Sequence, residues 1–191
     1  MAFLRSPFSS DPPPVLRNDR VTLRSPEMGD FEQWAALRVE SREFLAPWEP
    51  VWPANDLTRS AFRSRVRQYW RDIDDDAAYP YFIFDRTGHR LLGALTLSNI
   101  RRGVAQTATL GYWMGAPFAG QGYMTAAARL VLSFAYGHLG LHRIEAACLP
   151  HNAPSIALLR RHGFEQEGYA RAYLKIAGKW SDHLLFAKVA D

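Results

Sequence analysis

The chain has 191 residues, of which 48% are hydrophobic, 13% aromatic and 22% charged, and its net charge is +4. This composition excludes an intrinsically disordered protein, and the single cysteine, Cys148, excludes an internal disulfide bond. The basic bias suits an anionic ligand but falls far short of a dedicated nucleic-acid binder, and the length favours a single domain.

The first fifteen residues are expected to form a flexible arm rather than a targeting segment. Residues 1–15 include three consecutive prolines and contain no sustained apolar stretch. No later run reaches about 18 uncharged apolar residues, because Arg129 interrupts the best candidate. We therefore expect an arm over 1–15, a folded domain over 16–191, no membrane partner and a cytoplasmic location.

Two helices are predicted in the first half of the chain, after a short strand over 20–24. The first helix begins at Asp30, where a capping-box-like pair with Gln33 starts it, and the prolines of the segment FLAPWEP (44–50) end it. The second runs over about 58–73 and has one apolar face. Its five arginines are spread around the helix and are followed by acidic residues. This pattern favours a solvated face over a nucleic-acid stripe or a calcium loop.

The remaining pattern predicts strands, then a crossover, then strands again. Strands are expected over 81–85, 91–97, 107–114, 143–149, 169–176 and 183–189, with the turn RTGH joining the first two. Helices are expected over about 123–138 and 153–161, with Gly163 as the stop of the second. The order predicts an α+β single domain with a mostly antiparallel, mixed central sheet flanked by helices.

The segment PFAGQGYMTA (117–126) stands between a strand and a helix and carries two glycines. Gly120 and Gly122 at a helix start suit a phosphate cradle, because amides there lack partners and glycine allows close approach; a tight turn explains them equally well. A P-loop is excluded, since Gln121 and Gly122 replace its Lys and Ser/Thr. A dinucleotide fingerprint is disfavoured by Thr125 and by the preceding antiparallel strands. The remaining phosphate interpretation is a diphosphate that is bound by neither of these two motifs.

Several stretches together resemble one family, the GNAT N-acetyltransferases. GYWMGAPFAGQGYMTAA is similar to the family's acyl-CoA-binding motif, although Pro117 replaces its leading Gln/Arg. FLAPWEP, LSNIRRG, HRIEAACLPHNAPS and GYARAYLKIAGKWSDH are similar to the RimJ/RimL branch, and most similar to its RimJ type. The likeness runs from about residue 16 to about residue 188. It implies the GNAT fold and acetyl-CoA as cosubstrate.

The resemblance also implies how coenzyme A is held. The amides of residues 120–124 would bind the pyrophosphate, and the pantetheine arm would lie along residues 112–114. The implied cofactor-binding residues are Tyr112, Trp113, Met114, Gly120, Gln121, Gly122, Tyr123, Met124 and Asn152. Ser155 would protonate the departing thiolate. Taken alone, Asn152 and Ser155 would as readily be helix caps, and Cys148 is expected to be a buried structural thiol rather than a nucleophile.

The general base is the open part of the predicted site. A peptide α-amino group has a pKa of about 7.7–8.0, so a modest base or a water chain is enough. Thr109 and Ala126 stand where relatives often carry Glu. Glu49 and Asp182 are therefore the candidates, with Glu145 third, and a structural role suits each of them equally well.

Other polar and aromatic residues are candidates for the acceptor side. Trp48, Asn99 and Tyr173 are expected to bind substrate, with Trp52 and Trp180 as further wall residues; ordinary packing, or a strand-end turn for Asn99, is the alternative. His142 and His151 are weaker candidates for proton relays. No metal is expected.

The predicted function is transfer of an acetyl group from acetyl-CoA to the N-terminal alanine amine of a ribosomal protein. The amine would attack directly, through a tetrahedral intermediate. Two alternatives stay open: the same chemistry on a polyamine, aminoglycoside or amino acid, and a weakly catalytic CoA-binding module for ribosome assembly. Direct nucleic-acid binding is not expected, because no aromatic and basic stacking motif is present, and a homodimer is left open.

Overall fold

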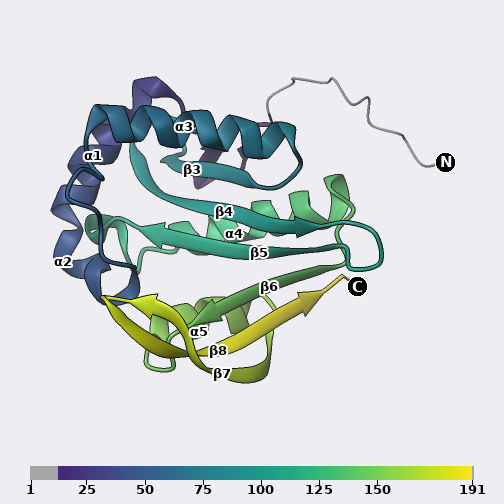
Figure 1. The fold of residues 1–191 in the computed structure, drawn as a ribbon. Helices are drawn as coiled ribbons and strands as arrows, with labels where there is room; N and C mark the ends of the chain where they lie inside the picture. Colours follow the sequence, from purple (N-terminus) through teal and green to yellow (C-terminus); the bar gives the residue numbers. More distant parts are fainter. Residues whose placement is uncertain (1–12, 191) are drawn as a thin grey trace.

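A single eight-stranded sheet organises the chain (Figure 1). The computed structural model describes residues 13–190, so most of the predicted arm over 1–15 lies outside the described residues. The strand order is β1-β2-β3-β4-β5-β6-β8-β7. The strands are β1 (Leu16–Arg17), β2 (Val21–Arg24), β3 (Tyr79–Asp85), β4 (Leu91–Arg101), β5 (Thr107–Met114), β6 (Arg143–Cys148), β7 (Glu165–Ile176) and β8 (Lys179–Val189).

Five α-helices connect and cover the strands. They are α1 (Phe31–Glu40), α2 (Arg42–Leu45), α3 (Arg59–Asp74), α4 (Tyr123–Ser133) and α5 (Ala153–Arg161). Short 3-10 turns span Met28–Asp30, Ala46–Trp48 and Ala116–Phe118, and a π-helical turn, Phe134–His138, extends α4. The predicted α+β single domain with a mixed, mostly antiparallel sheet is confirmed. Within the described residues, no helix has the length and apolar character needed to span a membrane.

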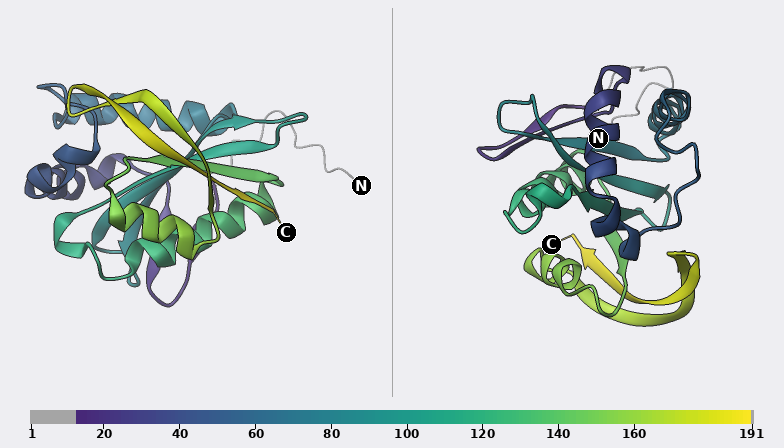
Figure 2. Two further views of the ribbon diagram at one scale, coloured as in Figure 1. Left: turned by 90° about the horizontal axis from the view of Figure 1, so that it is seen from below. Right: turned by 90° about the vertical axis from the view of Figure 1, so that its left-hand side faces the viewer.

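The helices form two layers, one on each face of the sheet. Helices α4 and α5 lie against one face, and α1 to α3 against the other (Figure 2). The core between them includes Phe62 of α3, Tyr81 of β3 and Val131 of α4, all fully buried. Val66 and Ile73 share the buried face of α3, as its apolar spacing predicts.

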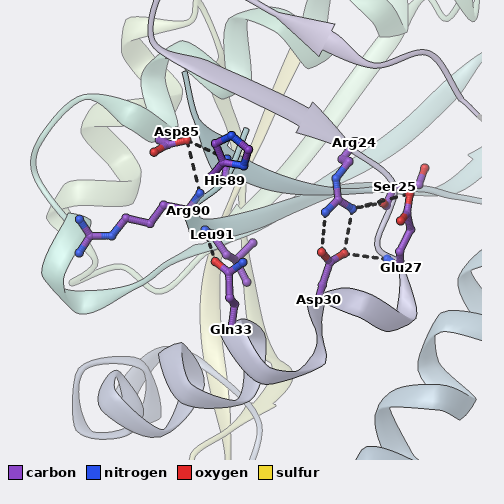
Figure 3. Close-up of polar contacts among 9 residues, drawn as sticks. All are labelled: Arg24, Ser25, Glu27, Asp30, Gln33, Asp85, His89, Arg90 and Leu91. Carbon is purple, nitrogen blue, oxygen red and sulfur yellow. Dashed lines mark hydrogen bonds and ion pairs between the residues drawn. The ribbon is translucent and has the colours of Figure 1, made fainter. Parts of the chain in front are cut away.

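Helix α1 is fixed to the sheet at its start. The Arg24 guanidinium donates two hydrogen bonds to Asp30, at 2.9 and 2.5 Å, and Asp30 also accepts from the Glu27 amide (Figure 3). One turn later, Gln33 Oε1 accepts from the Leu91 amide of β4 at 3.0 Å. These contacts set the direction of α1, which carries Arg38 toward the functional site.

Several elements differ from their predicted lengths; β4, for example, continues to Arg101, four residues beyond its predicted end. The first predicted helix breaks into α1 and α2 at Ser41, a buried residue whose Oγ accepts from the Ala116 amide at 2.9 Å. The last two strands begin about four residues earlier than predicted. Their added residues are exposed or half-buried and, apart from Gly168 and Trp180, polar, so they lack the alternation that marks a buried strand.

Strands β5 and β6 form the parallel pair of the predicted crossover, and they separate after a few residues. Pairing covers only Thr107–Thr109 of β5 and Arg143–Glu145 of β6. Beyond that point the two strands spread apart, and α2 and the β7–β8 turn lie at the open end (Figure 1). The rest of β5, from Leu110 to Met114, therefore has a strand partner on one side only.

Candidate active site

The gap between the separating strands holds a cavity of about 620 Å³. It is lined by β5, the start of α4, α5, the end of β6 and the β7–β8 hairpin. Two further segments line it: the glycine loop (residues 119–122) and the wall after α2 (Trp48 and Glu49). Eleven of the predicted site residues line it: Trp48, Glu49, Tyr112, Trp113, Met114, Gly120, Gly122, Tyr123, Met124, Asn152 and Ser155. Four do not: Asn99, Gln121, Tyr173 and Asp182.

The glycine loop presents unpaired amides at the start of α4. Gly120 and Gly122 have positive φ values of 73° and 81°, which glycine adopts without strain. In the described part of the chain, the amides of residues 120–124 donate to no recorded main-chain or side-chain acceptor, and Gly122 supplies no side-chain cap. A Cβ at Gly120 would meet nothing within 4 Å, so the space beside that amide is open. This arrangement fits a diphosphate at a helix N-terminus.

Two arginines that the sequence reasoning did not single out adjoin this loop. Arg20 donates to the Gln121 carbonyl at 2.7 Å, and its guanidinium lies 5.2 Å from the centre of the Tyr123 ring. Arg161, at the end of α5, lines the cavity and donates to Thr125 Oγ1 at 3.3 Å. Both place positive charge beside the amides. Only the tertiary structure brings them there, since the segments are distant in sequence.

The exposed edge of β5 offers main-chain groups to the cavity. The Gly115 amide donates to the Leu92 carbonyl, so Leu92 and Gly115 form a hydrogen-bonded pair of the antiparallel ladder. Hydrogen-bonded and non-hydrogen-bonded pairs alternate along such a ladder, so the next pair, Gly93 with Met114, is not hydrogen-bonded. By this alternation, the N–H and C=O groups of Tyr112 and Met114 face away from β4 and into the gap. An extended ligand can pair with that edge as an added strand would.

Tyr112 and Ser155 form a hydroxyl pair inside the cavity, with their oxygens 2.6 Å apart. Burial raises the pKa of Tyr112 to about 12, although the bond to Ser155 works in the opposite direction, so the phenol keeps its proton near neutrality. Cys148 is buried, as predicted, and its thiol also lines this part of the cavity. Burial raises the pKa of that thiol. Asn152 Oδ1 accepts from the Ser155 amide at 3.2 Å, so it caps α5 and also lines the cavity.

The wall after α2 is held by an ion pair around Glu49. Arg38 is 7% exposed and donates to both carboxylate oxygens of Glu49, at 2.9 and 2.6 Å, while Trp52 Nε1 donates to Oε2 at 2.8 Å. The Arg38 guanidinium lies over the Trp52 and Trp113 rings, 4.0 and 4.8 Å from their centres. Three donors thus occupy the Glu49 carboxylate, an arrangement that suits a structural anion and gives no support to its predicted role as base.

The other predicted acidic bases lie outside the cavity lining. Asp182 accepts from Tyr169 at 2.5 Å and from the Ala172 amide at 2.8 Å, and these bonds lower the pKa of its carboxyl group. Glu145 pairs with Arg143, at the other end of β6 from the cavity. The geometry therefore supports neither of them as the base.

The remaining acceptor-side candidates are spread more widely. Asn99 is exposed in a bulge of β4, with φ at 51°, level with the paired part of β5 and away from the cavity. Trp48 lines the cavity, and its ring centre lies 5.4 Å from that of His151. Tyr173 is half exposed, and its ring meets the edge of His183. His183 itself is 3% exposed and lines the cavity. The pattern of apolar and polar residues in the last strand did not predict this position.

Comparison with known proteins identifies the family of this chain. The acetyltransferase (GNAT) domain family matches residues 20–165. The probable N-acetyltransferase YjcK of Bacillus subtilis (strain 168) is 36% identical over 173 residues, covering 91% of this chain and 96% of that protein. The ribosomal protein uS5-alanine N-acetyltransferase of Escherichia coli (strain K12) is 35% identical over 181 residues, covering 94% and 93%.

A solved structure of an acetyltransferase is also similar to this chain. RimJ of Mycobacterium smegmatis, in complex with CoA-disulfide, superposes with a TM-score of 0.87 at 32% identity, covering 95% of this chain and 88% of that one. The open amides of the glycine loop and the unpaired edge of β5 fit the diphosphate and the amide-bearing arm of such a ligand. Acetyl-CoA is therefore the cosubstrate. The chain belongs to the GNAT acetyltransferase family and is an acetyl-CoA-dependent N-acetyltransferase.

Proposed function

We propose that this acetyltransferase modifies the N-terminal alanine amine of a ribosomal protein. The relative at 35% identity named for that reaction supports the proposal, since nearly the whole of both chains aligns. Such an acceptor also accords with a cytoplasmic location. The observation that carries the proposal is the exposed surface at the mouth of the cavity.

The cavity opens beside two exposed apolar side chains of the β7–β8 hairpin, Leu174 and Tyr173. Leu174 lines the cavity and is also 43% exposed, so it joins the inside to the outer surface. Tyr173 beside it is 48% exposed, and its ring contacts His183 in the cavity lining. Trp180 is 66% exposed, but it pairs with Lys175, so its side chain lies on the other face of the hairpin. Exposed aromatic side chains at the mouth of a site are typical of peptide and protein contacts. A polypeptide whose first amine enters the cavity would have a surface on which its next residues can lie.

The cavity has two sides, one that binds the cosubstrate and one that binds the acceptor. On the cosubstrate side, the amides of residues 120–124 hold the diphosphate, and the edge of β5 at Tyr112 and Met114 aligns the arm. Acetyl-CoA supplies the activated acyl group as a thioester. A main-chain amide at Met114 is placed to bind the oxygen on which negative charge develops. Ser155 is placed to give its hydroxyl proton to the departing sulfur, with Tyr112 orienting that hydroxyl.

The acceptor side is formed by the wall after α2 and by the hairpin. Trp48 and Tyr173 are proposed to contact the first residues of the acceptor. Glu49 keeps this wall in place, because its main-chain carbonyl accepts from the Ala177 amide of the β7–β8 turn at 2.9 Å while its side chain is held by Arg38. Asp182 supports the hairpin from outside. Both carboxylates thus act on the shape of the acceptor site.

A kinetic screen tests the acceptor. Synthetic peptides that begin with Ala, Ser or Met, otherwise identical, are compared with spermidine, an aminoglycoside and free alanine, by following release of the CoA thiol. We expect the highest kcat/KM for the Ala-starting peptide, and none for the same peptide with a blocked amine. A higher kcat/KM for a small amine would contradict the ribosomal acceptor. Calorimetric binding of acetyl-CoA without turnover of any amine would instead favour a CoA-binding module.

A further inference from the structure

His183 of β8 lies in the wall of the cavity, and no role described above uses it. The side chain is 3% exposed. The next residue, Leu184, pairs with Cys148 of β6, which lines the same cavity, so His183 lies where β6 and β8 reach the reaction space. Leu174 and Ile176 of the neighbouring strand line the cavity with it. A polar side chain buried at this place calls for a physical explanation.

One ring nitrogen of His183 is committed to the protein. Nδ1 lies 2.9 Å from the Ser181 carbonyl oxygen, and because a carbonyl can only accept, Nδ1 carries the hydrogen. In the neutral ring this leaves Nε2 with a lone pair. Nε2 makes no hydrogen bond to any of residues 13–190. It is also not one of the fully enclosed polar atoms in that range that lack a hydrogen bond, so its surface is accessible. Nε2 is therefore the nitrogen that the ring presents to the cavity.

The orientation of the ring is fixed from a second side. The Tyr173 ring meets the imidazole edge to face, with centres 5.7 Å apart and planes at 66°. Together with the Ser181 bond, this contact holds the lone pair of Nε2 in one direction, as a base needs.

Other titratable groups beside His183 or in the cavity lining are less suited to accept a proton. On the hairpin, Asp182 is held by two donors, and Tyr173 is a phenol in ring contact. On the wall after α2, both oxygens of Glu49 are occupied. On β6, burial keeps the Cys148 thiol protonated. Among these groups, His183 alone combines a lone pair with a position in the cavity lining.

We propose that His183 is the general base that accepts the proton of the acceptor amine. The assignment rests on the proposed transfer to an amine. As the nitrogen–carbon bond forms, the amine proton passes to Nε2; the carbon–sulfur bond breaks, and the sulfur leaves with the hydroxyl proton of Ser155. The imidazolium gives its proton to solvent, and Ser155 regains one from solvent. The sum is an amide and the CoA thiol, with no other reactant.

The sharpest test is His183→Asn, which keeps a donor near the position of Nδ1 for the Ser181 carbonyl but offers no base. We expect kcat/KM for the best amine to fall by about 10²- to 10⁴-fold, with acetyl-CoA affinity unchanged. His142→Gln is the matched control, because that histidine is exposed at the other end of β6 and outside the cavity lining. It should leave kcat/KM unchanged. Equal activity of His183→Asn and the wild type would overturn the proposal.

The pH profile separates a base from a structural histidine. In the acidic range, where the amine and the base are both protonated, log kcat/KM of the wild type should rise with a slope of two, since both groups must lose a proton. In His183→Asn the slope should be one, from the amine alone. A slope of two in the variant would show that the second proton belongs to another group and would sink the assignment.

A measurement without turnover completes the test. Long-range proton–nitrogen NMR of the histidine rings, assigned with the two variants, should show His183 in the Nδ1–H form when neutral. The Nε2–H form would overturn the proposal. If the wild type acetylates no peptide, the acceptor proposed above fails, and the His183 assignment is then judged by the tautomer and by whichever amine the enzyme does use.

Discussion

At the scale of single residues, the two glycines before α4 have the most direct consequence. Both have positive φ, and their amides are open, so a side chain here costs backbone strain and also fills the space of the ligand. For Gly122→Val we expect the KM for acetyl-CoA to rise at least about tenfold, equivalent to about 1.4 kcal/mol, with the acceptor KM little changed. Initial rates at varied acetyl-CoA check this.

A matched control separates strain from lost binding. Gly88 has φ at 79° in the β3–β4 turn, a Cβ added there would meet nothing within 4 Å, and the residue lies outside the cavity lining. Gly88→Val should lower thermal stability about as much as Gly122→Val and leave the KM for acetyl-CoA at the wild-type value. An unchanged KM in the Gly122 variant would argue against binding at this loop.

The hydroxyl pair of Tyr112 and Ser155 gives a second prediction at this scale. If Tyr112 orients the Ser155 hydroxyl, Tyr112→Phe and Ser155→Ala remove the same effect, and their losses in kcat should not add. We expect each variant to lose about tenfold or more in kcat, and the double variant to lose little beyond the larger of the two. Single-turnover rates at saturating acetyl-CoA measure the cycle. Fully additive losses would show that the two hydroxyls act independently.

At the scale of the elements, the wall after α2 depends on one buried ion pair. The side chains of Arg38 and Glu49 are 8% and 19% exposed, so removing the carboxylate leaves a buried, unpaired guanidinium. Glu49→Ala should therefore lower the free energy of unfolding by about 3–5 kcal/mol. Glu32→Ala, which removes an exposed pair with Arg59, should change it by less than about 1 kcal/mol. Urea denaturation followed by tryptophan fluorescence compares them.

The same elements explain how a cavity can exist inside a continuous sheet. The β7–β8 hairpin is anchored to the wall by the Ala177–Glu49 main-chain bond, while β5 and β6 separate after three paired residues. The gap is thus bridged at its open end by a turn rather than closed by strand pairing. This leaves the edge of β5 free for a ligand, and it keeps His183 and Ser155 on elements that are themselves packed and rigid.

At the scale of the whole molecule, ligand binding and stability are linked. Helices α4 and α5 and strands β5 and β6 all contribute to the cavity, so CoA should bind the folded chain only. At about one hundred times its Kd, CoA should add about 2.7 kcal/mol and raise Tm by about 5–10 °C. Pantetheine at the same concentration lacks the phosphates and should raise Tm far less. An equal shift with both would show that the phosphates add little to the affinity.

Local patterns were enough to predict most elements of the fold. The spacing of apolar residues and the residues that start and stop each element predict β5 and α5 with the bounds that the structure has. Both kinds of feature lie within or next to the element itself. The family motif predicts the cosubstrate side for a similar reason. The proposed binding groups there are backbone amides, and glycines at a helix start indicate these without knowledge of the rest of the fold.

The acceptor side depended on contacts between distant segments. Arg38 pairs with Glu49 across a break between helices, and His183 reaches the cavity only because β8 pairs with β6 beside the opening. An isolated histidine in an apolar strand has the same pattern whether it is structural or catalytic. The order of helical and strand patterns determined the fold class, and the two glycines marked the candidate cofactor loop. Only the tertiary structure decided which charged groups are neutralised by partners and which histidine lines the cavity, since burial and pairing are properties of packed surfaces.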